Sequence, residues 1–139
     1  MEQRLRDFYT ESQVSNATPG QMLVMLYDCL IEHTERAAQE INAPTIPGDM
    51  RRASREVCWS INVLTELSTS LRHNVDPKLC SLLSDLYRFF TRQLSESLEN
   101  QQADKIHEIL PLIKKLRGTW VEADRQASRV KPASIAIAA

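Results

Sequence analysis

Residues 17–28 read ATPGQMLVMLYD, and this stretch defines how the first long helix begins. Thr18 suits the N-cap, Pro19 suits the first helical position, and Gln21 stands three residues after the cap, as in a capping box. Positions 22–26 are then apolar without a gap, so the first two turns lack a solvent face. A helix packed on one neighbour needs an apolar stripe only about 100° wide. We therefore expect this helix to be covered on several sides.

Apolar residues recur at helical spacing in four segments of similar length. The expected helices span residues 19–41, 49–72, 77–98 and 105–127. The expected caps of the last three are Asp49, Asp76 and Asp104. Each helix is roughly 33–36 Å long at 1.5 Å per residue, and short connections favour antiparallel neighbours. The sequence therefore predicts an all-α, antiparallel up-down-up-down four-helix bundle.

The chain of 139 residues fits a single domain with two short extensions. We assign residues 1–17 to an N-terminal arm, residues 18–128 to the bundle, and residues 129–139 to a mobile, flexible C-terminal tail without a hydrophobic period. Pro111 falls inside the fourth helix, and we expect it to kink that helix because proline cannot donate the regular backbone hydrogen bond.

The composition indicates a cytoplasmic protein. The net charge of −1 creates no field that would attract nucleic acid. No apolar stretch reaches the roughly 20 residues that span a membrane, and the N-terminus MEQRLRDFYTES lacks an apolar signal core. Each of the three cysteines falls within an apolar helical pattern, which predicts buried, reduced thiols at Cys29, Cys58 and Cys80. We expect neither membrane insertion nor a nucleic-acid partner.

The ionisable residues do not form an enzyme site. A di-metal bundle needs two Glu-x-x-His motifs, whereas this chain offers only one related pair, Asp104 and His107. No helix carries two histidines four residues apart, and no nucleophile or phosphate-binding motif is visible. We therefore predict no catalytic residues, no metal site and no cofactor.

A small basic cluster, Arg51, Arg52 and Arg55, opens the second helix. The simpler interpretation is a solvated turn, helped by Glu56. However, positive charge near a helix N-terminus is locally unfavourable, by about a few tenths of a kcal/mol. An acidic partner is the alternative interpretation.

Several helices carry more apolar residues than one stripe requires. The extra positions include Trp59 and Val63 in the second helix and Tyr87 and Phe89 in the third. One explanation is a wide core that the arm and the tail complete. The other is a surface groove that receives the amphipathic helices of a partner.

The order of residues in the first helix resembles the FliS family of bacterial flagellin-specific secretion chaperones. In that family a tyrosine precedes a V-x-x-A-S-P-G-x-L stretch that runs into M-L-Y-[DN]. The matching residues here are Tyr9, Val14, Ala17, Pro19, Gly20, Leu23, Met25, Leu26, Tyr27 and Asp28. Weaker matches follow in later helices, so the resemblance covers roughly residues 9–123. The chain departs from the family at Cys29, where glycine is usual.

The resemblance implies a non-enzymatic helical bundle that binds the C-terminal segment of newly made flagellin, prevents its premature polymerisation and keeps it ready for type III secretion. It implies that the arm covers part of the binding groove, with Tyr9 as a replaceable lid. The expected partner-binding residues are Tyr9, Val14, Met22, Met25, Trp59, Val63 and Tyr87. Two questions stay open: whether the chain contacts the flagellar export apparatus, and whether a FliS-like bundle here binds a different secreted or regulatory protein.

Overall fold

A computed structural model describes residue 5, residues 9–72 and residues 74–129. Phe8 of the arm, His73 and residues 130–139 of the assigned tail lie outside the described residues. The helices are α2 (Glu11–Ser15), α3 (Pro19–Asn42), α4 (Arg51–Thr69), α5 (Pro77–Asn100) and α6 (Asp104–Ala127). The described part of the chain contains no strand.

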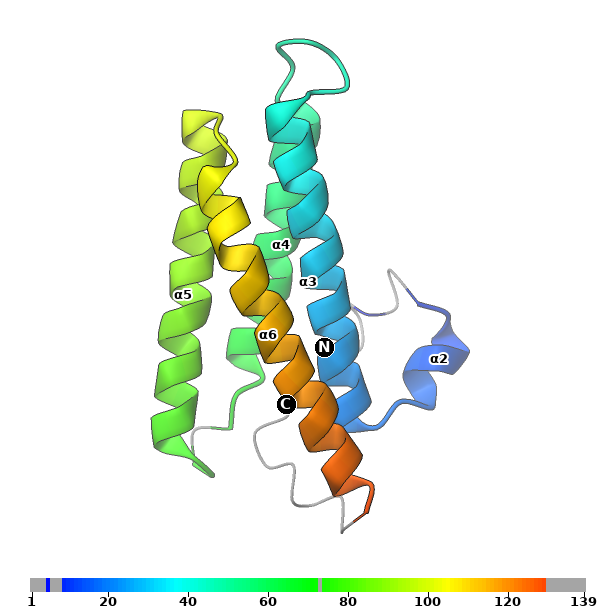
Figure 1. The fold of residues 1–139 in the computed structure, drawn as a ribbon. Helices are drawn as coiled ribbons and strands as arrows, with labels where there is room; N and C mark the ends of the chain where they lie inside the picture. Colours follow the sequence, from blue (N-terminus) through cyan, green and yellow to red (C-terminus); the bar gives the residue numbers. More distant parts are fainter. Residues whose placement is uncertain (1–4, 6–8, 73, 130–139) are drawn as a thin grey trace.

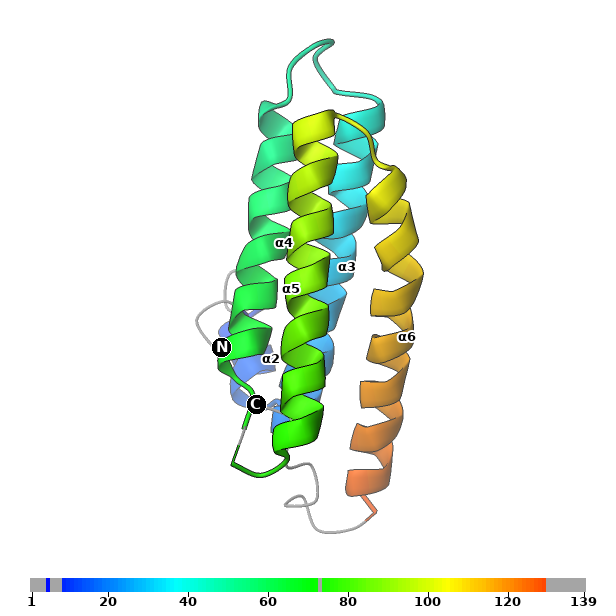
Figure 2. The ribbon, with the colours of Figure 1, turned by 90° about the vertical axis from the view of Figure 1, so that its left-hand side faces the viewer.

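The four long helices form an antiparallel bundle in chain order. Helix α3 packs on α4 and α6, and α5 packs on the same two helices from the opposite corner. The α3–α4 and α5–α6 connections lie at one end of the bundle, and the α4–α5 connection lies at the other (Figures 1 and 2). The short helix α2 lies beside the N-terminal half of α3 (Figure 1). The predicted four-helix bundle is confirmed.

Two predicted helix starts are present in atomic detail. The Gln21 amide donates to Thr18 Oγ1 at 3.1 Å, and the Thr18 amide donates to Gln21 Oε1 at 2.9 Å, which completes the capping box. At the start of α5, the Leu79 amide donates to the Asp76 carboxylate at 3.2 Å. A second capping box, between Thr10 and Gln13, begins α2.

Two other predicted caps are wrong. Met50 is the N-cap of α4, and Asp49 instead accepts the Arg51 amide at 2.9 Å and its guanidinium at 2.8 Å. Asp104 is the first residue of α6, whose N-cap is Ala103. Asp104 still lies in the first turn, where a negative charge is favourable next to the helix dipole.

The ends of α4 and α5 depend on local hydrogen bonds. Helix α4 ends at Thr69, where the hydroxyls of Thr69 and Ser70 donate to the Glu66 carbonyl. Helix α5 ends with Gln101 in the left-handed conformation, at φ 53°, and the Gln102 amide donates back to the Ser97 carbonyl at 3.0 Å. This 6→1 bond is typical of a Schellman motif.

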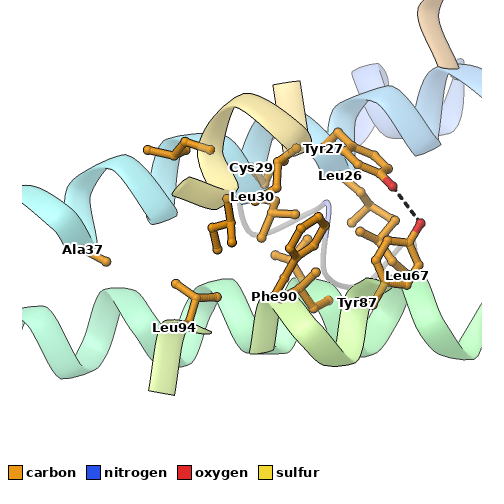
Figure 3. Packing of buried hydrophobic residues seen from close by; sticks show 14 of the residues in the cluster. Leu26, Tyr27, Cys29, Leu30, Ala37, Leu67, Tyr87, Phe90 and Leu94 are labelled. Atoms are coloured by element: carbon orange, nitrogen blue, oxygen red, sulfur yellow. Dashed lines mark hydrogen bonds between the residues drawn. The ribbon is translucent and has the colours of Figure 1, made fainter. Parts of the chain in front are cut away.

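The core is a single apolar cluster to which all four long helices contribute. Its largest fully buried side chains include Tyr27, Tyr87 and Phe90 (Figure 3). The hydroxyls of Tyr27 and Tyr87 lie 2.7 Å apart, which satisfies both polar groups inside an otherwise apolar centre. Helix α3 contacts α4, α6 and the arm. It is therefore the centrally packed helix that its apolar first two turns predict.

Candidate functional site

The N-terminal arm is anchored on the bundle by two apolar side chains. Leu5 is 0% exposed and Val14, in α2, is 1% exposed, and both belong to the core cluster. Between them, Tyr9 is half-buried against the same cluster and interacts with the side chain of Cys29. Burial, followed by the proximity of Cys29, raises the pKa of Tyr9 to about 12. The arm is thus a docked element with an aromatic ring at its centre.

A groove opens where the arm, α3 and α6 meet, with a volume of about 590 Å³. We call it the arm groove. Its lining residues are Tyr9, Gln13, Asn16, Ala17, Gln21, Val24, Met25, Arg117, Val121 and Asp124. The half-buried Val24 and Met25 and the exposed Val121 give it an apolar floor, and the arm contributes amide side chains along one rim. Such a surface suits an apolar side chain from a segment that also carries hydrogen-bonding groups.

An ion pair between α3 and α6 borders the arm groove. Arg117 Nε donates to Asp28 Oδ1, and both side chains are about four-tenths exposed. About two turns further along α3 and one turn further along α6, Lys114 lies 3.6 Å from Glu35. Because these pairs are exposed, each contributes about 0–1 kcal/mol, and their main effect is to keep this seam polar.

A second apolar surface lies on α5, beside its buried face. We call it the α5 stripe. Its residues are Leu79, Leu82, Leu86 and Phe89. Leu82 is 63% exposed and Phe89 is 37% exposed, whereas Leu79 and Leu86 are half-buried. Their spacing of three and four residues places all four on one side of the helix.

The α5 stripe borders α6. Glu96 follows Phe89 by seven residues and therefore lies on the same side of α5, where it pairs with Lys105 of α6. Leu112 follows Lys105 by the same interval and is 45% exposed. Because the helices are antiparallel, Phe89 and Leu112 lie on facing sides of one seam. This seam combines three large exposed apolar side chains, Leu82, Phe89 and Leu112, which is unusual for a surface without a partner.

The residues expected to bind a partner fall into different environments. Tyr9 and Met25 line the arm groove, and Val14 lies beneath the arm. Met22 is half-buried against the core cluster. Val63 and Tyr87 are 0% and 2% exposed, so a partner can reach them only if the bundle opens.

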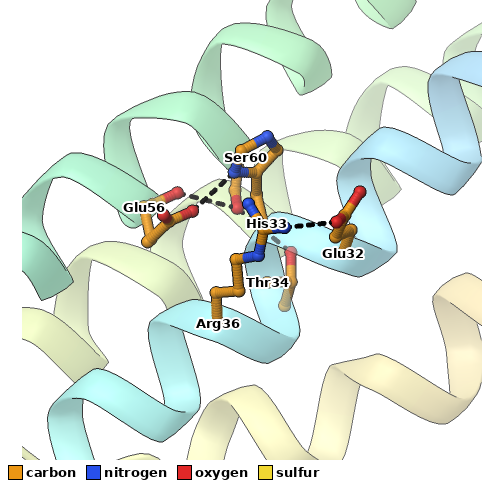
Figure 4. Close-up of polar contacts among 6 residues, drawn as sticks. All are labelled: Glu32, His33, Thr34, Arg36, Glu56 and Ser60. Carbon is orange, nitrogen blue, oxygen red and sulfur yellow. Dashed lines mark hydrogen bonds and ion pairs between the residues drawn. The ribbon is translucent and has the colours of Figure 1, made fainter. Parts of the chain in front are cut away.

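Trp59 lies on a separate face, where α4 packs on α3. Its ring is stacked on His33, with centroids 5.5 Å apart and planes 16° apart. His33 Nδ1 lies 2.5 Å from Glu56 Oε2, and the Thr34 hydroxyl donates to Ser60 at 3.2 Å (Figure 4). These contacts make Trp59 part of a polar connection between two helices.

Sequence reasoning missed two features of these surfaces. Helical spacing places both Leu82 and Leu83 on the apolar side of α5, but only Leu83 is buried, at 3% exposed, whereas Leu82 is 63% exposed. It also expected three buried thiols, whereas Cys58 is exposed and only Cys29 and Cys80 are buried. The available signal for Leu82 was its position seven residues before Phe89, which marks a second stripe beside the first.

The described residues contain no group of three or more His, Cys, Asp and Glu side chains able to hold a metal ion. Within the same residues, none of the helices combines the length and the apolar character that crossing a membrane requires.

Comparison with known proteins gives two concordant matches. The family model described as flagellar protein FliS matches residues 1–127. A flagellar secretion chaperone FliS of Bacillus subtilis (strain 168) is 25% identical over 115 residues, which cover 83% of this chain and 82% of that protein. Because the family match includes the arm and all four long helices, the chain belongs to the FliS family of flagellar secretion chaperones.

Proposed function

We propose that this flagellar export chaperone binds the C-terminal segment of newly made flagellin in the cytoplasm and keeps it from polymerising before export. The family is one of chaperones and not of enzymes, so the function lies in binding. The observation that carries the proposal is the α5 stripe, whose Leu82 and Phe89 are exposed along the same seam as the exposed Leu112 of α6. An amphipathic helix with apolar residues at three- and four-residue spacing would cover this seam.

The arm groove supplies a second, smaller contact for the same segment. A partner that contacts two surfaces on different sides of a bundle must wrap around it, which suits a segment that orders on binding. Such a segment gains contact area but loses part of the gross interaction energy to its own ordering. The proposed arrangement therefore combines a broad surface with a moderate affinity.

The arm acts as a replaceable cover in this proposal. Full displacement would expose Leu5 and Val14, at a cost of about 1.5–3 kcal/mol for each side chain, or about 3–6 kcal/mol together. A cost of that size lowers apparent affinity by roughly 10²- to 10⁴-fold. Displacement of Tyr9 alone would cost less, because part of its ring is already exposed to solvent. We therefore assign the lid role to Tyr9 and the anchor role to Val14.

Calorimetric titration with full-length flagellin and with flagellin lacking its C-terminal segment tests the function. We expect binding only to the full-length protein. Leu82→Gln/Phe89→Gln should weaken binding by about 30-fold or more, as the loss of interface hot spots does. Ile46→Gln is the matched control, since Ile46 is also exposed but lies in the distant α3–α4 connection.

Equal binding of both flagellins would contradict the proposed client segment. Equal effects of the stripe variant and Ile46→Gln would contradict the proposed surface. Tyr9→Ala tests the lid separately: it should alter the affinity for the C-terminal segment. An unchanged affinity, together with unchanged exposure of the arm groove, would leave Tyr9 without that role.

A further inference from the structure

Two arginines on α4 form no ion pair with a described residue, although the charges of Glu40 and Asp49 attract Arg52 from a distance. Arg52 and Arg55 are exposed, and neither forms an ion pair with a residue that the structure describes. We call them the arginine patch. They lie one helix turn apart, so their Cβ atoms are about 5–6 Å apart. The patch is at the end of the bundle that holds the α3–α4 connection, at the far end of α3 from the arm (Figure 1).

The acidic groups around the arginine patch are already engaged by other residues. Asp49 binds Arg51 through both carboxylate oxygens, and the hydrogen bond from Arg51 is the main reason that the pKa of Asp49 falls to about 2. Glu56 contacts His33 at 2.5 Å. Glu40 accepts the backbone amide of Thr45 at 3.0 Å. The two guanidinium groups therefore keep their donors directed to solvent.

Two shallow cavities meet at the arginine patch. The larger, of about 290 Å³, is lined by Ile46, Asp49, Arg51, Arg52 and Arg55. The smaller, of about 150 Å³, lies on the α3 side of the same two arginines and is bounded by Arg36, Gln39, Glu40 and Glu56. Ile46 is 50% exposed and adds an apolar contact beside the charges.

Helix physics gives no reason to place these charges here. The backbone amides at the start of α4 already carry partial positive charge, so arginines in the first turns are slightly destabilising. No described carboxylate forms an ion pair that would offset this effect at Arg52 or Arg55. The other arginines that line the two cavities, Arg36 and Arg51, are each paired with a carboxylate.

We propose that the arginine patch docks an acidic segment of a partner protein other than the flagellin segment, with Ile46 contacting an apolar residue of that segment. An extended chain places residues i and i+2 on one side about 7 Å apart, which matches two neighbouring guanidiniums. Residue i+4 lies on the same side as i and i+2, so a motif of two carboxylates at i and i+2 followed by an apolar residue at i+4 fits the two arginines and Ile46. Carboxylate is a suitable ligand because arginine donates to it through two parallel N–H groups.

The size of the patch favours a peptide over other anionic partners. Lipid recognition by charge typically uses clusters of 4–8 basic residues, and nucleic-acid binding uses a longer basic stripe. Two unpaired arginines beside one exposed isoleucine match a short protein motif in both charge and apolar content. The proposed contact is independent of the α5 stripe and the arm groove.

Fluorescence anisotropy with a labelled Glu-Ser-Glu-Ser-Leu peptide in a Gly-Ser context tests the proposal, and the same peptide with Gln-Ser-Gln-Ser-Leu is its control. At low salt the acidic peptide should bind and the amide peptide should not. Arg52→Gln/Arg55→Gln should weaken binding by about fivefold to tenfold, the size expected for two exposed charge contacts, and added salt should weaken the wild type likewise.

Arg88→Gln/Arg92→Gln is the matched control variant, because both arginines are exposed on α5 and lie one turn apart. Equal peptide binding by the two double variants, or no preference for the acidic peptide, would overturn the proposal. Binding of the wild type to phosphatidylcholine–phosphatidylglycerol vesicles, lost in Arg52→Gln/Arg55→Gln without a peptide effect, would assign the patch to a lipid surface instead. Flagellin binding should be unchanged in this variant, and its loss would make the patch part of the client interface.

Discussion

The hydroxyl groups of Tyr27 and Tyr87 lie 2.7 Å apart in the centre of the bundle, on α3 and α5. The Tyr27 ring also packs on Trp120 of α6, with centroids 6.4 Å apart. Burial is the main cause that raises the pKa of both tyrosines, so both hydroxyls stay protonated. One polar contact thus joins diagonally opposed helices within an apolar core.

Removal of one of these hydroxyls should destabilise the bundle. Tyr87→Phe leaves the buried Tyr27 hydroxyl without this partner, at a cost of about 1–2 kcal/mol in the free energy of unfolding. The double variant Tyr27→Phe/Tyr87→Phe should cost less than the sum of the single variants, because it leaves neither tyrosine hydroxyl buried without its partner. Urea denaturation followed by circular dichroism measures all three values. Additive losses would show that the two groups are not coupled.

The contact between His33 and Glu56 should be worth more than a surface pair. Both side chains are largely buried, at 5% and 18% exposed, whereas Glu32 and Arg36 on the same helix are about half exposed. Glu56→Ala should lower the free energy of unfolding by about 1–3 kcal/mol, since it leaves a buried imidazole without this acceptor. Glu32→Ala should change it by less than about 0.5 kcal/mol. Similar losses in both variants would contradict this ranking.

Replacement of Pro111 should stabilise α6. The residue is exposed inside a helix that continues from Asp104 to Ala127, and it cannot donate to the His107 carbonyl. Pro111→Ala restores that donor and should raise the free energy of unfolding by about 1–3 kcal/mol. Thermal denaturation gives the comparison, with Leu112→Ala as a neighbouring exposed control. A loss of stability in Pro111→Ala would mean that the packing of α6 on its neighbours requires the proline.

The sequence predicts those features that depend on neighbouring residues. The capping box at Thr18 is recognisable because both partners lie within four positions. The caps at Asp49 and Asp104 were misassigned because an acidic residue before a helix can occupy either the cap or the first turn. Which of the two occurs depends on the path of the preceding connection, and that path is not encoded in a local pattern.

The candidate site is less predictable because it depends on the distinction between neighbouring apolar positions. Leu82 and Leu83 are identical in type, yet they are 63% and 3% exposed. Helical periodicity tolerates either residue in the core when two stripes lie side by side. The same ambiguity placed Val63 and Tyr87 on a partner surface although both are buried. Only the packing of α5 between α4 and α6 decides which stripe remains outside.

Alkaline pH should weaken the packing around Cys29. Burial, followed by the negative charge of Glu32, raises the pKa of this thiol from 9.0 to about 12. The unfolded chain therefore releases the thiol proton at lower pH than the folded chain. The contribution of this neutral thiol to the free energy of unfolding is complete below about pH 9 and is lost between pH 9 and 12. Urea midpoints at pH 8 and pH 10 measure the effect. Cys29→Ala should show a smaller fall, and an identical fall would assign the pH dependence to other groups.

The reactivity of Cys29 should also report the position of the arm. The thiol is 3% exposed and interacts with Tyr9, so it should react slowly with Ellman's reagent, whereas Cys58 is exposed and should react fast. In a Cys58→Ser/Cys80→Ala background, addition of Tyr9→Ala should accelerate the reaction of Cys29, because the ring that packs on the cluster is lost. Binding of the flagellin C-terminal segment should have the same effect if the segment displaces the arm without covering the thiol. Thr10→Ala, which removes the cap of α2 but keeps the ring, separates the two contributions to arm docking. A reaction rate that stays the same in Tyr9→Ala would show that the bundle protects Cys29 without help from the arm.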